Sequence, residues 1–228
     1  MGNLFGVFSP YVSWCGVGVN WVSVLIILVV FPTSFWVMPY SWVVVVSQAV
    51  MNLKSEFSSL LSRFQQPGSL LIPTSMFAVL VCLNLGGLLP YVFTGTAHLS
   101  FTLSLGLPLW LGQIVYSSFK QPLWVLAHLV PQGAPGALSP FMVLIELVSN
   151  VIRPLTLGVR LFANLTAGHI LVVLLSGVCG GSATPIALLF LVALLTLELA
   201  VSVIQGYVFS TLNVLYFSES ETKFLTVG

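Results

Sequence analysis

Long apolar stretches, broken by prolines, glycines and a few charges, dominate the chain. Up to residue 63 the only charged side chains are Lys54, Glu56 and Arg63, and from residue 64 to 121 the only one is Lys120. Several apolar runs therefore exceed the ~20 residues with which a helix crosses a bilayer. The sequence contains no alternation of polar and apolar positions typical of barrel strands. This pattern predicts an all-α membrane protein with a single integral membrane domain over residues 1–228.

The first half of the chain predicts a single crossing followed by a surface helix. Residues 17–39 are expected to form the N-terminal transmembrane helix, because they are apolar and end near two prolines. Residues 41–64 become amphipathic, which predicts a helix lying on the bilayer surface. Its apolar positions recur at helical spacing, at Val50, Leu53, Phe57, Leu60, Leu61 and Phe64.

A transmembrane hairpin is expected next, over residues 69–89 and 99–119, with a short turn that contains His98. Lys54, Arg63 and Lys120 then fall on one side of the membrane. The positive-inside tendency assigns that side to the matrix or cytoplasm. Residues 120–140 contain four prolines and are expected to form a connector.

The last third predicts two unusually long helices, over residues 141–176 and 185–217. At 1.5 Å per residue the first would be roughly 54 Å long, whereas the hydrocarbon core is about 30 Å thick. Two strongly tilted helices packed as a hairpin satisfy both lengths.

Composition narrows the function classes. The chain is 58% hydrophobic, with six Lys or Arg, five Glu and no Asp, and its net charge is +1, which favours neither nucleic acid nor an acidic partner. Cys15, Cys82 and Cys179 lie far apart in apolar segments, so we expect no disulfide framework, no metal site and no cofactor. No basic residue precedes Lys54, and neither a signal peptide nor an Arg-rich transit peptide is expected.

Ionisable residues inside the two long helices are the candidate functional groups. An ionisable side chain at bilayer depth costs from about 2.5 to more than 10 kcal/mol. On the first long helix, polar residues form one stripe at 100° per residue. The stripe either contains a local Glu146–Arg153 pair or lines water or the charge of a partner. Its members are Glu146, Asn150, Arg153, Arg160 and Asn164.

His169 points in another direction, because it is half a turn out of phase with Arg160. On the second long helix Glu198, Ser202 and Gln205 share a face that can meet His169 across the hairpin. Such a pair is either packed polar structure or a proton relay.

The run SPFMVLIELVSNVIRPLTLGVRLFANLTAGHILVVLL, residues 139–175, resembles the signature of the ATP synthase subunit a family. The run LELAVSVIQGYVFSTL, residues 197–212, is similar to the final helix of that family. AHLVPQG and the N-terminal NLFGVFSP resemble its short mitochondrial members.

The resemblance implies a membrane subunit of the proton-translocating ATP synthase in the mitochondrial inner membrane, which catalyses nothing on its own. Its implied partners are the c-ring, other F0 and peripheral-stalk subunits, protons and the lipid bilayer. Arg160 matches the essential arginine that faces the c-ring, and Glu146 matches the carboxylate of the matrix-side half-channel. His169 and Glu198 match the half-channel of the intermembrane space, with Asn164 and Gln205 as polar neighbours. Bacterial members usually exchange the carboxylate and the histidine between the two helices, and Arg153 has no assigned role.

Two other function classes compete with this interpretation. A secondary transporter or a proton-pumping respiratory subunit also buries charges, but such folds commonly contain internal repeats, and none is visible here. A non-conducting scaffold subunit would gain nothing from the cost of Arg160.

Overall fold

A computed structural model describes residues 6, 8–11, 18–30, 41–61, 68–89, 92–120, 122, 138–178 and 184–222. These residues form helices and turns, with no strand in the ranges just given, so the prediction of an all-α protein is confirmed. The predicted connector over residues 120–140 and the ends of the predicted segments 17–39 and 41–64 lie largely or partly outside these ranges.

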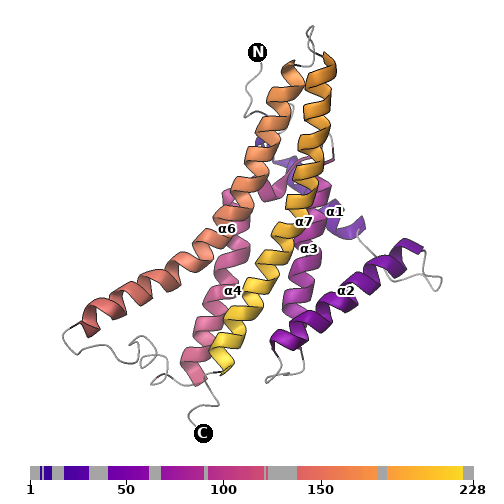
Figure 1. Ribbon diagram of the computed structural model, residues 1–228. Helices are drawn as coiled ribbons and strands as arrows, with labels where there is room; N and C mark the ends of the chain where they lie inside the picture. Colours follow the sequence, from indigo (N-terminus) through magenta and orange to yellow (C-terminus); the bar gives the residue numbers. More distant parts are fainter. Residues whose placement is uncertain are drawn as a thin grey trace.

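The N-terminal part contributes two shorter α-helices on one side of the long ones (Figure 1). A short turn, η2 (Val19–Trp21), leads into α1 (Val22–Val30), which has nine residues. Helix α2 (Ser41–Leu60) crosses α7 and reaches it through Phe57 and Leu61, which are buried against Val214. Leu60, one of the predicted apolar positions, is 42% exposed, because the buried stripe of α2 follows the spacing of Phe57 and Leu61.

The hairpin of α3 (Leu71–Gly87) and α4 (Leu99–Lys120) packs against the last two helices. Its turn contains the short helix η3 (Gly95–Ala97), which contacts both hairpin helices and also α6. Close approach of α3 to α7 requires a glycine: a Cβ on Gly206 would lie 2.8 Å from the Val81 side chain.

The longest elements are α6 (Ser139–Val178) and α7 (Thr184–Thr222), with 40 and 39 residues. Each is roughly 60 Å long, about twice the thickness of a hydrocarbon core. In Figure 1 the later part of α6 runs beside the first part of α7, whereas the first part of α6 diverges from the bundle. Pro154 lies inside α6, where the missing N–H and the ring bend a helix.

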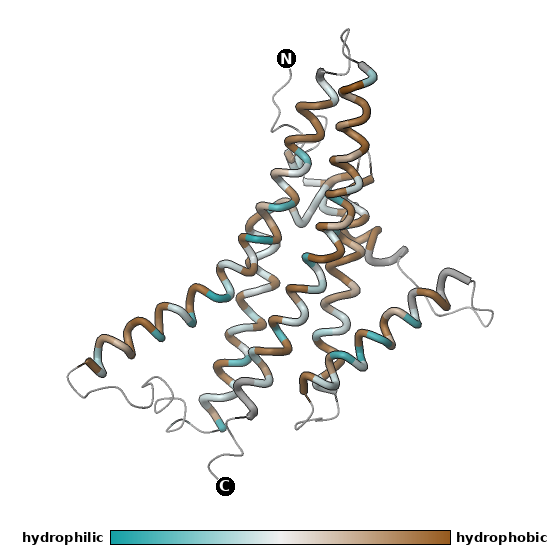
Figure 2. The backbone as a smooth tube through the Cα atoms, viewed as in Figure 1, coloured by the Kyte–Doolittle hydropathy of each residue, from teal (hydrophilic) through white to brown (hydrophobic). Residues whose placement is uncertain are grey.

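Figure 2 shows hydrophobic residues recurring along these helices, with hydrophilic ones between them. In the described ranges three helices are long and apolar enough to cross a membrane: Leu99–Lys120, Ser139–Gly177 and Pro185–Ser218. Helix α3 is apolar but shorter. The core between them consists of Leu80, Leu157, Leu161 and Phe209. This core fixes the faces that α6 and α7 present to each other and to the outside.

Candidate proton-translocation site

His169 of α6 and Glu198 of α7 face each other across the contact between the two helices. The His169 Nε2 atom lies 3.8 Å from Glu198 Oε1, and the two side chains are 16% and 5% exposed. In the described part of the chain, neither carboxylate oxygen nor the Nε2 atom has a hydrogen-bond partner. A buried polar group without a partner costs about 1–3 kcal/mol, more when it is charged. At 3.8 Å the two side chains make no direct hydrogen bond, so their buried polar atoms can still accept a further partner.

Gly168 provides the space for this carboxylate. A Cβ on Gly168 would lie 2.6 Å from Glu198 Oε1 and 2.8 Å from the Glu198 Cδ atom. Sequence reasoning missed this contact, although a glycine beside the only histidine of an apolar helix was a signal for a close approach. Glycine here lets the carboxylate reach the histidine.

The polar face of α7 continues with Ser202 and Gln205, which are both buried. The Asn164 Nδ2 atom donates to Gln205 Oε1 at 3.1 Å, so the structure brings these two predicted residues together. The Asn84 Nδ2 atom of α3 donates to the Ser202 carbonyl at 3.1 Å. Asn84 was not predicted, and its signal was a lone amide within the apolar residues of α3. The amide and hydroxyl groups extend the polar site from α6 and α7 onto α3.

A second buried amide contact lies further along α7. The Gln113 Nε2 atom of α4 donates to the Asn213 carbonyl at 3.3 Å and also to the Asn213 side-chain oxygen. Both residues border a largely apolar cavity of about 290 Å³ between α3, α4 and α7. None of the predicted site residues lines this cavity. The polar site at His169 and Glu198 is thus separate from this cavity.

Arg160 lies on the outer face of α6 and is exposed. In the described ranges it makes no ion pair. Leu157 and Leu161, on either side of it in sequence, are buried in the core. Thr156, Ala163, Asn164 and Ala167 share its face and are also exposed or partly exposed. A permanently charged guanidinium is therefore presented outward between polar and small residues.

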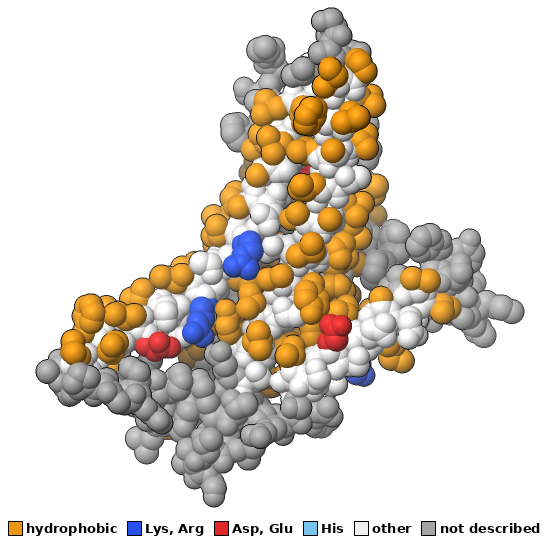
Figure 3. Space-filling view, viewed as in Figure 1, with side chains coloured by type: hydrophobic (Ala, Val, Ile, Leu, Met, Phe, Trp, Pro, Cys, Tyr) orange, Lys and Arg blue, Asp and Glu red, His pale blue; other side chains and the backbone are white. Residues whose placement is uncertain are grey.

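Glu146 and Arg153 lie on the first part of α6, before or at its bend. Arg153 lies over the Tyr216 ring of α7, with 5.5 Å from Cζ to the ring centroid. No ion pair joins Arg153 to Glu146, both of which the structure describes. Figure 3 shows the charged side chains of α6 on one face, which elsewhere is largely apolar. The alternative of a local Glu146–Arg153 pair is therefore not what the structure contains.

Comparison with known proteins decides the family. Residues 17–218 match the family described as ATP synthase A chain. The chain belongs to this family. It is 46% identical to ATP synthase subunit a of Anopheles quadrimaculatus, over 96% of this chain and 99% of that relative. It is 45% identical to the same subunit of Anopheles gambiae and of Drosophila mauritiana, with the same coverage.

Members of the ATP synthase A chain family are proton-translocating membrane subunits of F-type ATP synthases, and this chain has that function in ATP synthesis. It is not an enzyme on its own. Its relatives are insect mitochondrial subunits, and the chain is a multi-pass protein of the mitochondrial inner membrane. It works together with other subunits of the F0 sector. The resemblance of residues 139–175 and 197–212 to subunit a is confirmed.

Proposed function

We propose that this chain provides two aqueous half-channels that open to opposite sides of the membrane, and that Arg160 separates them and faces the c-ring. The observation that carries the proposal is the contrast between two polar groups on α6. Arg160 is exposed without an ion pair in the described ranges, whereas His169 turns inward to a buried carboxylate. An arginine is retained on such an apolar surface when a partner of opposite charge approaches it.

The chemistry of Arg160 suits this role. A guanidinium keeps its proton at any physiological pH, so it cannot relay protons, but it attracts a ring carboxylate that has just lost its proton. At ~4 Å and an effective dielectric constant near 20 this attraction is about 4 kcal/mol, which holds the carboxylate transiently without trapping it. The fixed positive charge also repels hydronium and blocks a direct leak. Protons then cross only when the ring turns.

The face around Arg160 supports contact with helices of a ring. Ala163 and Ala167 are exposed on it, and small residues let a neighbouring helix approach closely within a membrane. Large apolar residues of α6 beside this face are also exposed, such as Val159 at 45% and Leu155 at 39%. A face of small residues flanked by apolar side chains suits contact with a partner helix that moves past α6.

The inlet half-channel, which receives protons from the intermembrane space, is assigned to His169 and Glu198. Asn164 and Gln205 extend it toward Arg160, because their side chains are hydrogen-bonded to each other one helical turn from that arginine. Neutral amides orient water without carrying a charge of their own. Glu146, on the diverging first part of α6, is assigned to the half-channel that opens to the matrix.

The membrane placement follows from the lengths of the helices. At roughly 60 Å, α6 and α7 fit a bilayer only when strongly tilted. Helix α1 belongs to the N-terminal span, α2 lies on the bilayer surface, and α3 and α4 cross as a hairpin. Lipid and the other F0 and peripheral-stalk subunits cover the remaining exposed apolar surface.

Cysteine labelling tests this arrangement. In assembled complex, Glu146→Cys is expected to react with an impermeant thiol reagent from the matrix side, and His169→Cys from the intermembrane side. Val151→Cys is the control, because Val151 is a 43% exposed apolar residue of α6, half a turn out of phase with Arg160, that is expected to face lipid. Labelling of both sites from the same side would contradict the two half-channels.

A further inference from the structure

His98 lies in an aromatic enclosure at the turn between α3 and α4. Its ring centroid is 5.2 Å from that of Trp21 and 5.1 Å from that of Phe93. Trp21 also packs against Phe93 at 5.4 Å and against Phe101 at 6.2 Å. The imidazole thus packs against rings from η2 and the turn, and Phe101 of α4 packs on Trp21 behind it.

The polar atoms in this enclosure are incompletely satisfied. The imidazole lies near the backbone of Phe8, but its Nε2 atom is buried and has no partner in the described ranges. The Thr96 hydroxyl, in the same turn, is 1% exposed and also lacks a partner there. Each such atom costs about 1–3 kcal/mol. An imidazole nitrogen retained at this cost suits a group that takes up and releases a proton.

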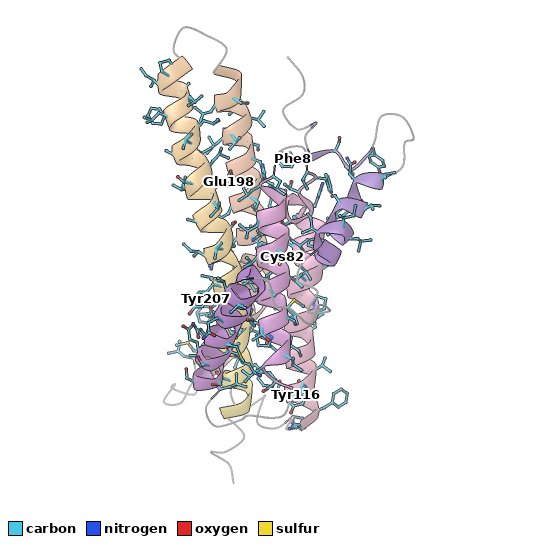
Figure 4. The ribbon with its side chains drawn as sticks, turned by 90° about the vertical axis from the view of Figure 1, so that its right-hand side faces the viewer. Phe8, Cys82, Tyr116, Glu198 and Tyr207 are labelled. Atoms are coloured by element: carbon cyan, nitrogen blue, oxygen red, sulfur yellow. The ribbon has the colours of Figure 1, made fainter. Side chains whose placement is uncertain are left out.

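Phe8 links this enclosure to the proposed inlet half-channel. Its backbone lies near His98, and its ring meets the His169 ring edge-on, with 6.4 Å between centroids. Helix η3, immediately before His98, packs on α6. Figure 4 shows Phe8 at the same level of the bundle as Glu198, with Tyr116 near the other end of α4. The two histidines therefore lie on either side of a single residue.

The position of His98 along the hairpin places it at one membrane face. Helix α4 begins directly after it and ends 22 residues later with Lys120. A helix of that length is about 33 Å long, close to the thickness of the hydrocarbon core. With Lys120 at the matrix side, as the positive-inside tendency indicates, His98 lies toward the intermembrane space.

We propose that His98 is a proton-accepting residue at the mouth of the inlet half-channel, passing protons around Phe8 to His169. This proposal rests on the proposed function of His169 and Glu198. The Nε2 atom of neutral His98 accepts a proton from hydronium of the intermembrane space. The imidazolium returns that proton to a water molecule on the inner side, from which His169 takes it. His98 is then neutral again, so one proton is moved and no other group is changed.

The surroundings of His98 agree with a neutral resting form. Burial lowers the pKa of His98, partly offset by the nearby Phe8 backbone, so the imidazole is uncharged at neutral pH. The titratable groups described on the packed elements are Cys82 of α3, Tyr116 and Lys120 of α4, and Glu146, Arg153, Arg160 and His169 of α6. In the described ranges, none of these forms an ion pair with His98.

The test compares proton flux through assembled complex carrying His98→Gln or His98→Ala with that of the wild type, in vesicles across a pH series on the inlet side. Glutamine keeps a polar side chain but cannot titrate. The flux of His98→Gln is expected to fall by roughly three- to tenfold at high inlet pH, where proton collection limits the flux, and to approach the wild type at low pH.

Added imidazole is expected to restore the flux of His98→Ala. Phe101→Leu, which disturbs the same enclosure through Trp21, is the packing control and should leave the pH profile unchanged.

Three outcomes separate this proposal from the function on which it rests. A pH profile of His98→Gln that superimposes on the wild type overturns the proposal. A loss that is equal at every pH and is not restored by imidazole also overturns it, since that result indicates packing alone. Glu198→Gln is measured in the same assay: if it blocks flux while His98→Gln does not, only the role of His98 is wrong, whereas normal flux through Glu198→Gln contradicts the proposed half-channel itself.

Discussion

The Nε2 atom of His169 lies 3.8 Å from Oε1 of Glu198, across the contact between the two longest helices. This separation is longer than a hydrogen bond, and both atoms lack other partners in the described ranges. A pair at this distance has room to reorganise around a proton or a water molecule. The same pair buried at hydrogen-bonding distance would be a fixed structural contact.

The first prediction concerns this pair. Glu198→Gln is expected to slow proton uptake at least tenfold, because an amide does not titrate, and His169→Ala to slow it less. The double exchange of His169→Glu with Glu198→His should conduct better than Glu198→His alone, since one carboxylate and one imidazole are then retained. Proton flux into vesicles containing equal amounts of assembled complex measures all four variants. A double exchange no better than Glu198→His would show that the two residues are not partners.

The second prediction uses Gly168, whose missing side chain makes room for Glu198. Gly168→Ala is expected to push the carboxylate away from His169, because the added Cβ would lie 2.6 Å from Oε1. Displacement of a reacting group by about 1 Å costs up to ~100-fold in rate, so a loss of roughly ten- to a hundredfold in flux is expected. Assembly should not suffer, since alanine favours a helix more than glycine does.

Gly177→Ala is the matched control, because a Cβ at that position of α6 meets no atom within 4 Å. Both variants are measured for proton flux and for the amount of assembled complex. Equal flux in the two variants would mean that Gly168 is not needed to position the carboxylate.

The third prediction concerns the attachment of α2 to α7. Phe57 is 0% exposed and packs in one cluster with Leu61 and Val214. Phe57→Ala is expected to weaken this contact by about 2 kcal/mol, less than the ~3–5 kcal/mol of a water-soluble core because lipid replaces part of the lost contact. Limited proteolysis of assembled complex should then cleave near α2 about thirty times faster. Met51→Ala, at a 65% exposed position of α2, should leave cleavage unchanged.

The sequence best predicted the features that depend on the residue spacing within a single helix. The spacing of Glu198, Ser202 and Gln205 predicts one shared face, and all three are buried together on α7. Length alone likewise predicted the two long helices, since local periodicity and few helix breaks are sufficient for such elements. The roles of Arg160, Glu146, His169, Glu198, Asn164 and Gln205 stay predictions.

Contacts between elements could not be read from spacing. The Asn84–Ser202 hydrogen bond joins residues 118 positions apart, and only the packing of α3 on α7 brings them together. Likewise, the Phe8 ring meets the His169 ring although 161 positions separate the two residues. The position of His98 in the sequence predicts only a turn residue. Its aromatic enclosure depends on Trp21 and Phe93, which come from two separate segments.

The measurement that tests the central claim most directly is ATP-driven proton pumping by assembled complex carrying Arg160→Ala or Arg160→Lys. Both variants are expected to lose nearly all pumping. Alanine removes the charge that attracts the ring carboxylate, and a lysine ammonium lacks the planar fork and loses its proton when it is desolvated. His169 and Glu198 are unchanged in both variants, so any loss of pumping is due to the change on the exposed face of α6. Coupled pumping near the wild-type rate in either variant would contradict the proposed role of Arg160.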